Sequence, residues 1–257
     1  MKITEVKCKT ALSKSNLPGL DYSLNPYRGC QHNCCYCYVP NVLRIPREDW
    51  GCFVNVKTNI PQVLSKELRK RKPGVVGLST VTDPYQPIEK KYRLARYCLE
   101  QLLIHDWPIS IQTKSNLILR DEGIITRFSD AEVIVSIGTL NDSERKMIEP
   151  CSSSIEERLE VLKTFSNSNV KRTVFFGPVY PTIKPENIPE IVDTFIKNGA
   201  KEIMIDKLNL KPGILQNIVK TSSLIGDKAS DKSNYDAILK TFFETCKEKK
   251  VKAISAF

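Results

Sequence analysis

The sequence predicts an α/β fold, built as a partial (β/α)6 barrel of the TIM type. Three observations indicate it: strand-like and helix-like patterns alternate, their connections are short, and about six strands can be distinguished where a closed barrel has eight. The chain has 257 residues, 41% of them apolar, and no Pro/Gly/Ser-rich linker divides it. We therefore expect a single domain, residues 1–257, with one core.

The expected strands are short runs of aliphatic and β-branched residues: Gly74–Ser79, Ile109–Thr113, Glu132–Ile137, Arg172–Phe176 and Glu202–Ile205. The expected helices are Glu89–Ile104, a stretch ending near Phe128, Ser154–Phe165, Ile188–Lys197 and Tyr235–Lys247. Ser154 and Glu157 have capping-box spacing, and Asn198-Gly199 is a typical helix end.

This order implies a mainly parallel sheet whose chemistry lies at the C-terminal ends of the strands. The polar or small residues expected there are Thr82, Asp83, Lys114, Ser136, Gly138, Asp206 and Asn209.

The chain is basic, with 39 Lys and Arg against 29 Asp and Glu, a net charge of +10. Such a charge suits a polyanion, so DNA or RNA is a possible partner. The N-terminus lacks the apolar stretch of a signal peptide, and no apolar run approaches the roughly 20 residues of a membrane helix. We expect a soluble, cytoplasmic protein without a membrane partner.

Four of the nine cysteines lie close together in the segment Cys30-Gln31-His32-Asn33-Cys34-Cys35-Tyr36-Cys37. Cys30, Cys34 and Cys37 have the spacing C-x3-C-x2-C, which predicts three thiolate ligands of a 4Fe–4S cluster with one iron left open. A zinc site would need a second cysteine pair, and a thioredoxin-like pair would leave Cys30 without a role. Cys35 is expected to pack as a small apolar residue.

Further motifs resemble the radical S-adenosylmethionine (SAM) superfamily, in particular its spore photoproduct lyase-like branch, which includes proteins similar to DNA repair photolyases. They are the segments 25–30 (Asn-Pro-Tyr-Arg-Gly-Cys), 82–89 (Thr-Asp-Pro-Tyr-Gln-Pro-Ile-Glu), 113–115 (Thr-Lys-Ser), 119–121 (Leu-Arg-Asp) and 149–150 (Glu-Pro). The resemblance covers a core of about residues 22–210. The remainder, about 211–257, is expected to be a helical extension.

The resemblance implies a partial barrel of the radical SAM kind that binds a 4Fe–4S cluster and SAM. The cluster would cleave SAM reductively and generate a 5′-deoxyadenosyl radical, with an electron donor such as ferredoxin or flavodoxin. Tyr36 would pack on the adenine side of SAM, Thr82 and Asp83 would hold its amino group or ribose, Lys114 its carboxylate, and Ser136 would assist.

One position departs from the lyase pattern. The cysteine that returns a hydrogen atom in spore photoproduct lyases corresponds here to Thr80. A threonine hydroxyl donates hydrogen atoms poorly, so the resemblance supports the wider family but not the lyase reaction itself. Tyr36 and Tyr38 are the candidate catalytic residues that could relay a hydrogen atom.

Three functions remain open from the sequence. The first is a radical SAM enzyme that acts on a nucleic acid, as the resemblance and the charge of +10 indicate. The second is the same chemistry on a peptide or a small metabolite. The third is a non-catalytic iron–sulfur protein that binds nucleic acid, against which the three-cysteine ligand set argues, because a structural cluster usually has four protein ligands.

Overall fold

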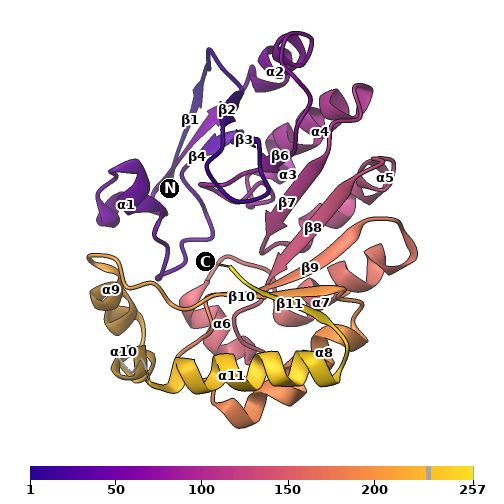
Figure 1. Ribbon diagram of the computed structural model, residues 1–257. Helices are drawn as coiled ribbons and strands as arrows, with labels where there is room; N and C mark the ends of the chain where they lie inside the picture. The colour runs from indigo at the N-terminus through magenta and orange to yellow at the C-terminus, as the bar shows by residue number, and fades with distance from the viewer. Residues whose placement is uncertain (230–232, 257) are drawn as a thin grey trace.

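The computed structural model describes residues 1–229 and 233–256. Figure 1 shows a curved sheet with helices along its outer side. The strands are β1 (Lys2–Val6), β2 (Leu12–Lys14), β3 (Tyr22–Leu24), β4 (Tyr27–Arg28), β5 (Phe53–Lys57), β6 (Val76–Leu78), β7 (Ile109–Thr113), β8 (Ala131–Ser136), β9 (Lys171–Phe176), β10 (Glu202–Ile205) and β11 (Lys252–Ser255). The α-helices are α1 (Val39–Leu43), α2 (Ile60–Leu68), α3 (Glu89–Tyr92), α4 (Leu94–Ile104), α5 (Glu122–Ile125), α6 (Asp142–Ile148), α7 (Ile155–Thr164), α8 (Ile188–Lys197), α9 (Ile214–Thr221), α10 (Ser223–Ala229) and α11 (Ser233–Glu248).

The main sheet has eight strands in the order β11-β10-β9-β8-β7-β6-β3-β2. All neighbours from β3 to β11 pair in parallel, and only β2 is antiparallel to its neighbour. The curved parallel sheet, open on one side, confirms the predicted partial barrel. A second sheet of three strands, in the order β1-β5-β4, lies beside it and leads into the cysteine loop.

Several predicted helix ends are confirmed. The Ser154 hydroxyl and the Glu157 side chain form the predicted capping box at the start of α7. Helix α8 ends at Lys197, and Gly199 follows with a φ of +99°. The predicted helix Glu89–Ile104 was wrong in one respect: Arg93 adopts a left-handed φ of +53°, which divides it into α3 and α4.

The two faces of the sheet have different surroundings. The Phe176 ring packs outward, with its centroid 5.7 Å from that of Phe195 on α8 and 6.4 Å from that of Phe242 on α11. Because successive side chains of a strand alternate between faces, Phe175 points the other way, into the barrel. The same rule assigns the interior side chains of the neighbouring strands.

A network of polar side chains fills the barrel interior near the N-terminal ends of the strands. Glu132 on β8 accepts hydrogen bonds from Ser110 on β7 (3.1 Å) and Thr173 on β9 (2.7 Å). Glu202 on β10 pairs with Lys252 on β11 at 2.6 Å. Lys171 lies 2.8 Å from Glu132 and 3.3 Å from Glu202, so it joins the two groups. The network links five adjacent strands at the end of the barrel opposite the cysteine loop.

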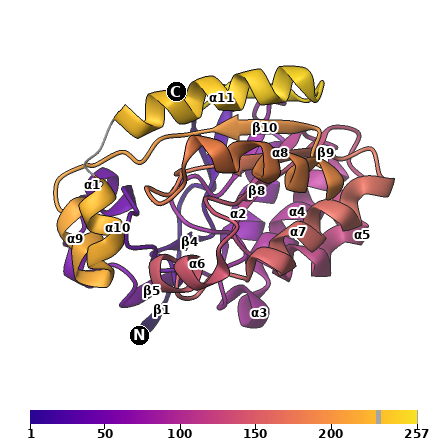
Figure 2. The same cartoon turned by 90° about the horizontal axis from the view of Figure 1, so that it is seen from below.

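The segment 211–257, expected to be helical, contains α9, α10, α11 and also the strand β11. Figure 2 shows α11 lying along β10 and α8, while α9 and α10 lie together beside α1. A hydrogen bond from the Asn41 side chain to the Pro212 carbonyl (3.2 Å) joins α1 to this segment. Within the described residues, no helix has the length and apolar character required to span a membrane.

Candidate cofactor and substrate site

The cysteine loop begins directly after β4, at a glycine that no other residue could replace without strain. Gly29 has a φ of +94°, and a Cβ atom there would lie 2.3 Å from the carbonyl oxygen of Phe53. Cys30 and Cys37 then pack in a small apolar cluster with Trp50 and Val39. A backbone hydrogen bond from Cys37 N to Cys34 O (3.1 Å) closes the turn between the second and third cysteines.

The three thiols lie close enough to influence one another. Burial, followed by the neighbouring Asp83 and Cys37, raises the pKa of Cys30 to about 12. Burial also raises the pKa of Cys34, with contributions from Glu149, Cys37 and Cys30. Lys114 acts in the opposite direction on Cys34 and favours its thiolate. Three soft sulfur donors gathered in one buried loop suit an iron–sulfur cluster.

Two buried donors near the loop support this fit. Trp50 Nε1 has no oxygen or nitrogen partner in the described part of the chain and interacts only with the Cys37 thiol, whose pKa this interaction lowers. Among the described residues His32 Nδ1 likewise has no hydrogen-bond partner, although it lies 3.6 Å from an oxygen of Asp83. Within residues 1–229 and 233–256, no three His, Cys, Asp or Glu side chains converge as the ligands of one ion would. A cubane cluster distributes its three thiolates over three irons, so such convergence is not required of them.

Cys35 occupies a different environment from the other three cysteines. Its side chain belongs to the main hydrophobic core, and its thiol interacts with Thr221 on α9. Its backbone N–H donates to Ile148 O (2.9 Å), and its carbonyl accepts from the Asn217 side chain (2.6 Å). These contacts attach the loop to α6 and α9 through Cys35, as its expected packing role requires.

Thr82 and Gln86, from the loop after β6, brace the start of the cysteine loop. The Thr82 hydroxyl donates to Gly29 O at 2.7 Å and accepts from the Gln86 amide at 2.9 Å. The Gln86 side-chain carbonyl accepts from the backbone N–H of Gln31 at 2.9 Å. Thr82 thus holds the loop. Its predicted contact with SAM stays a prediction.

Asp83 is almost fully engaged within the chain. One of its oxygens accepts from the Thr113 hydroxyl (2.7 Å) and from the Tyr85 N–H (2.9 Å). The other accepts from the backbone N–H of Lys114 (2.8 Å). The carboxylate therefore joins the ends of β6 and β7 and fixes the direction in which Lys114 leaves the sheet. A direct contact with SAM stays a prediction.

The Lys114 ammonium lies at the end of β7, facing the cysteine loop. It lies 5.9 Å from the centroid of the Tyr36 ring. Burial alone would lower the pKa of Lys114, but Glu149 and Cys34 outweigh this effect and raise it, so the side chain is charged at neutral pH. Among the described residues, no hydrogen bond or ion pair engages this ammonium.

Ser136, at the end of β8, lies beside Lys114 across the sheet. Its hydroxyl accepts from the Gln112 amide at 3.1 Å, and its carbonyl accepts from Arg158 at 2.8 Å. The side chain is 1% exposed. Its predicted assistance in SAM binding is not tested by these contacts.

The two candidate catalytic tyrosines differ in accessibility. The Tyr36 hydroxyl donates to Glu149, and the Tyr36 ring makes an edge contact with Tyr180, with centroids 6.2 Å apart. Tyr38 is 48% exposed. Burial raises the pKa of Tyr38, Cys37 and Asp206 raise it further, and Lys114 lowers it. The Tyr38 hydroxyl is therefore within electrostatic range of these three side chains. Tyr38 is therefore the more exposed of the two candidate tyrosines, and their catalytic role stays a prediction.

A buried ion pair holds Tyr36 in position, and the sequence did not reveal it. Glu149 pairs with Arg158, and both side chains are 1% exposed. Burial alone would raise the pKa of Glu149, but Arg158 and Lys114 lower it to about 2. The Glu149-Pro150 motif was the only sign of this pair, because nothing in the sequence indicates that Arg158 reaches across from α7.

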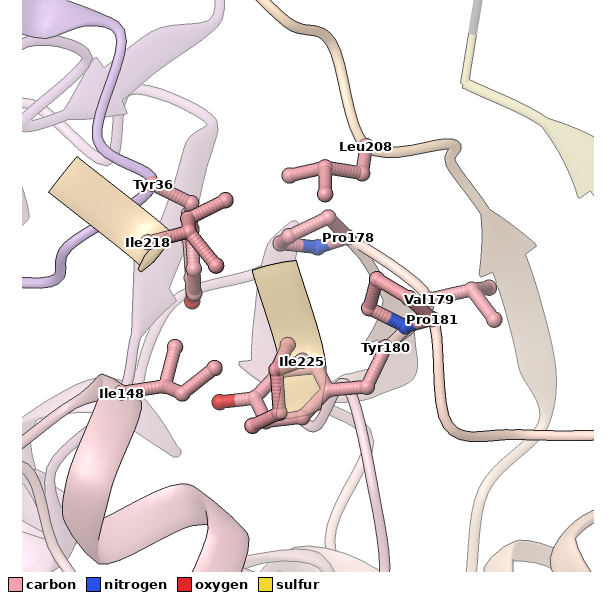
Figure 3. Close-up of a pocket in the computed structure, with 9 residues that line it drawn as sticks. All are labelled: Tyr36, Ile148, Pro178, Val179, Tyr180, Pro181, Leu208, Ile218 and Ile225. Carbon is pink, nitrogen blue, oxygen red and sulfur yellow. The ribbon is translucent and has the colours of Figure 1, made fainter. Parts of the chain in front are cut away.

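A small apolar cavity lies beside Tyr36 and Tyr180. Figure 3 shows nine residues around it, two of which, Ile218 and Ile225, come from α9 and α10. The others are Tyr36, Ile148, Pro178, Val179, Tyr180, Pro181 and Leu208. The C-terminal segment therefore completes the wall behind Tyr36.

Two other sequence motifs have structural roles. Glu89 is fully buried and pairs with Arg120 at 2.6 Å, and its carboxylate also accepts from Tyr27 and from Ala95 N. Asp121 pairs with the same arginine at 2.7 Å. The motif around residues 119–121 thus braces α3 and α4 against β4. Thr80, at the position of the lyase cysteine, donates its backbone N–H to the Asn25 side-chain oxygen at 3.0 Å and is half-buried.

The chain matches one family model and is similar to several uncharacterized proteins. The sequence model of the radical SAM superfamily matches residues 24–195. The chain is 31% identical to the uncharacterized protein MJ0683 of Methanocaldococcus jannaschii over 253 residues, 94% of this chain and 93% of that protein. It is also 31% identical to the uncharacterized protein Rv2578c of Mycobacterium tuberculosis, covering 80% of this chain and 65% of that longer protein.

Two solved structures have the same fold. Spore photoproduct lyase, as a mutant with bound AdoMet and dinucleoside spore photoproduct, superposes with a TM-score of 0.72 at 13% identity, over 99% of this chain and 82% of that one. Streptococcus suis SuiB, bound to the precursor peptide SuiA, gives 0.59 at 14% identity, over 99% of this chain and 48% of that one. At these identities the likeness concerns the fold alone.

Proposed function

Because this chain belongs to the radical SAM superfamily, and is therefore a radical SAM enzyme, we propose that Cys30, Cys34 and Cys37 bind a 4Fe–4S cluster that cleaves SAM reductively. We propose further that the resulting radical acts on a nucleic acid. When bound, the cluster supplies the electron that splits SAM into methionine and a 5′-deoxyadenosyl radical.

The observation that carries this proposal is the unpaired Lys114 ammonium. A half-buried cation without a hydrogen bond is incompletely solvated, and an anion in the space beside it would compensate this cost. The carboxylate of SAM is such an anion, and the cysteine loop that would hold its cluster lies next to Lys114. Lys114 would therefore bind and orient the methionine end of the cofactor.

The surrounding residues would keep the site rigid and dry. Arg158 and Glu149 fix the Tyr36 hydroxyl, so the ring can present one face to the adenine side of SAM. Thr82 and Asp83 hold the cysteine loop and Lys114 in a fixed relation. Residues preorganised in this way need not rearrange during the reaction.

Nucleic acid is the substrate class that we favour. The charge of +10 would attract phosphates independently of sequence. The lyase with the same fold has a dinucleoside photoproduct as its ligand. Because Thr80 replaces a thiol, we propose a different radical reaction on the nucleic acid rather than the lyase reaction. Tyr38, half-exposed beside Cys37, would be the residue that relays a hydrogen atom.

A peptide substrate is the second candidate, because the SuiB structure with the same fold holds a precursor peptide. In either case the electron would come from a small reductant such as ferredoxin or flavodoxin. A reducing cytoplasm, our proposed location, suits free thiols and a cluster of low potential.

The proposal is tested with protein reconstituted anaerobically with iron and sulfide, then given SAM and dithionite. We expect 5′-deoxyadenosine to form, and more of it when the true substrate is added from pools of DNA, RNA or peptide. SAM deuterated at the 5′ position reports whether the radical abstracts hydrogen from that substrate. If no 5′-deoxyadenosine forms in protein that contains the cluster, the proposed chemistry is wrong.

A further inference from the structure

One row of side chains inside the barrel is polar at one end and apolar at the other. Strand pairing places Phe175 beside Ser136 on one side and beside Met204 on the other, and Met204 beside Ile254. Lys114 follows Thr113, the partner of Val135, so it belongs to the same row as Ser136. The row thus runs from Lys114 and Ser136 to three apolar residues, Phe175, Met204 and Ile254, which we call the apolar tract.

The side chains of the apolar tract are partly exposed. Its neighbours along the strands, Phe176, Ile203 and Ile205, are all 0% exposed because the outer helices cover them. The three residues of the tract are only partly buried, although they lie in the same strands. For Phe175 and Met204 the exposed surface must therefore face the barrel interior. Ile254 lies beside Met204 in the same row, on the edge strand β11. An apolar surface exposed in a concave interior is typical of a ligand site.

An acidic side chain adjoins the tract at the rim. A Cβ atom on Gly177 would lie 2.5 Å from a ring carbon of Phe175 and 2.9 Å from the Cβ of Asp206. The Phe175 ring and Asp206 therefore meet over the bare backbone of Gly177. Asp206 interacts with the Lys207 backbone and the Asn209 side chain, and no salt bridge engages it within the described part of the chain. Asp206 is only partly buried, and a carboxylate can accept more than two hydrogen bonds, so it can also accept one from a ligand.

We propose that the apolar tract and Asp206 form the subsite for a nucleobase of the substrate. The base would stack on the Phe175 ring against Met204 and Ile254 and would donate an N–H to the Asp206 carboxylate. This inference rests on the proposed function and names the part of the nucleic acid that enters the barrel.

The chemistry of the subsite selects this ligand over other parts of a nucleic acid. An aromatic ring beside aliphatic side chains stacks a planar base, and a carboxylate accepts from base N–H groups. A phosphate would be repelled by Asp206, and a sugar has no flat face to stack. The position also fits the reaction, because the row joins the tract to Lys114 and Tyr38 lies within the influence of both Asp206 and Lys114. A base reaching this interior must leave its duplex stack or already be single-stranded.

The test uses the reconstituted holoprotein, saturated with SAM and without reductant. Binding of the four deoxynucleoside 5′-monophosphates is followed by NMR titration, with 2-deoxyribose 5-phosphate as the probe that lacks a base. We expect at least one nucleotide to bind and the abasic sugar phosphate not to bind. Phe175→Ala and Asp206→Ala should each weaken nucleotide binding about tenfold or more.

Matched variants make the result specific. Phe243→Ala and Asp106→Asn change the same residue types on the outer surface and at the opposite end of the barrel, and should leave binding unchanged. Phe175→Leu keeps the apolar volume but removes the aromatic face, so it should weaken binding even if the alanine variant folds poorly.

SAM affinity, measured in the same variants, separates the outcomes. If it falls with the nucleotide affinity, the tract holds the adenine of SAM, and the proposed subsite is wrong. Equal nucleotide binding in the wild type and both variants, or no nucleotide binding at all, would also overturn it. The proposed function is tested separately, by 5′-deoxyadenosine formation in the wild-type protein, which does not depend on how these variants behave.

Discussion

The Lys114 ammonium lies 5.9 Å from the centroid of the ring of Tyr36, a residue of the cysteine loop. The two residues come from different parts of the chain, Tyr36 from the loop after β4 and Lys114 from the end of β7. Asp83 fixes the Lys114 backbone, and Glu149 fixes the Tyr36 hydroxyl. Both residues are therefore held in place by contacts within the chain, and the Lys114 ammonium can still bind an external anion.

Replacing Lys114 with Ala should leave the cluster in place and weaken SAM binding. A charge-assisted contact of this kind contributes about 1.5–3 kcal/mol, or about ten- to a hundredfold in affinity. Equilibrium dialysis with SAM under anaerobic conditions measures the effect. Lys184→Ala, at a side chain that is 64% exposed, is the matched control and should bind SAM normally. Unchanged SAM affinity in the Lys114 variant would remove this residue from the site.

The Glu149–Arg158 pair should be important for stability as well as for position. Replacing Arg158 with Met leaves the Glu149 carboxylate buried without its partner, which should cost about 3–5 kcal/mol in the free energy of unfolding. Urea denaturation measures this loss. The double variant Glu149→Gln, Arg158→Met should be less destabilised than the sum of the two single variants, because it leaves no unpaired charge. Additive losses would show that the pair does not act as a unit.

Asp206 gives a pH dependence of stability with a definite sign. Burial raises the pKa of Asp206 to about 6, although Lys207 and Asn209 act to lower it. The Asp206 charge in turn raises the pKa values of Tyr38 and Tyr235. The folded state therefore holds this proton more tightly than the unfolded state does, and the wild type loses stability as the pH rises toward 6.

Asp206→Asn cannot lose a proton, so its stability relative to the wild type should grow between pH 5 and 7. We expect a gain of about 1 kcal/mol, allowing for the solvent screening of a half-buried group. Urea denaturation of both proteins at several pH values gives the difference. A difference that stays constant from pH 5 to 8 would show that the carboxyl has an ordinary pKa.

The four clustered cysteines should separate into two classes. Changing Cys30, Cys34 or Cys37 to Ala should abolish the visible absorption of the reconstituted cluster, since each supplies one thiolate. Cys35→Ala should retain about four irons per chain, because its thiol lies in the core beside α9. The Cys35→Ala substitution should instead lower the free energy of unfolding by about 1 kcal/mol, as expected for a small buried side chain. Loss of iron in Cys35→Ala alone would reverse the ligand assignment.

The sequence predicted the parts of this protein that depend on local patterns. The strands β7 to β10 and the helices α7 and α8 follow from apolar periodicity and capping residues, and the cysteine spacing identified the loop. The helix break at Arg93 was missed, because α3 and α4 turn around the buried Glu89, and this carboxylate accepts from the backbone N–H of Ala95.

Other features depend on contacts between distant segments. Strand β11 is a short run containing Lys252, and its pairing with β10 and with Glu202 gives it a place in the sheet. The Glu149–Arg158 pair and the apolar tract likewise arise only when several strands and helices assemble. The residues quoted for SAM binding did come together at one end of the barrel, but contacts such as those of Asp83 with Thr113 and Lys114 N became visible only in the structure.

The central claim is that three cysteines hold a cluster with one iron left for SAM. Electron paramagnetic resonance of the reduced, reconstituted protein, recorded with and without SAM, tests it most directly. We predict a 4Fe–4S signal that changes when SAM is added in the wild type and in Cys35→Ala, and no such signal in Cys34→Ala. A cluster signal that SAM leaves unaltered in the wild type would contradict the claim, because it would mean that no iron is open to the cofactor.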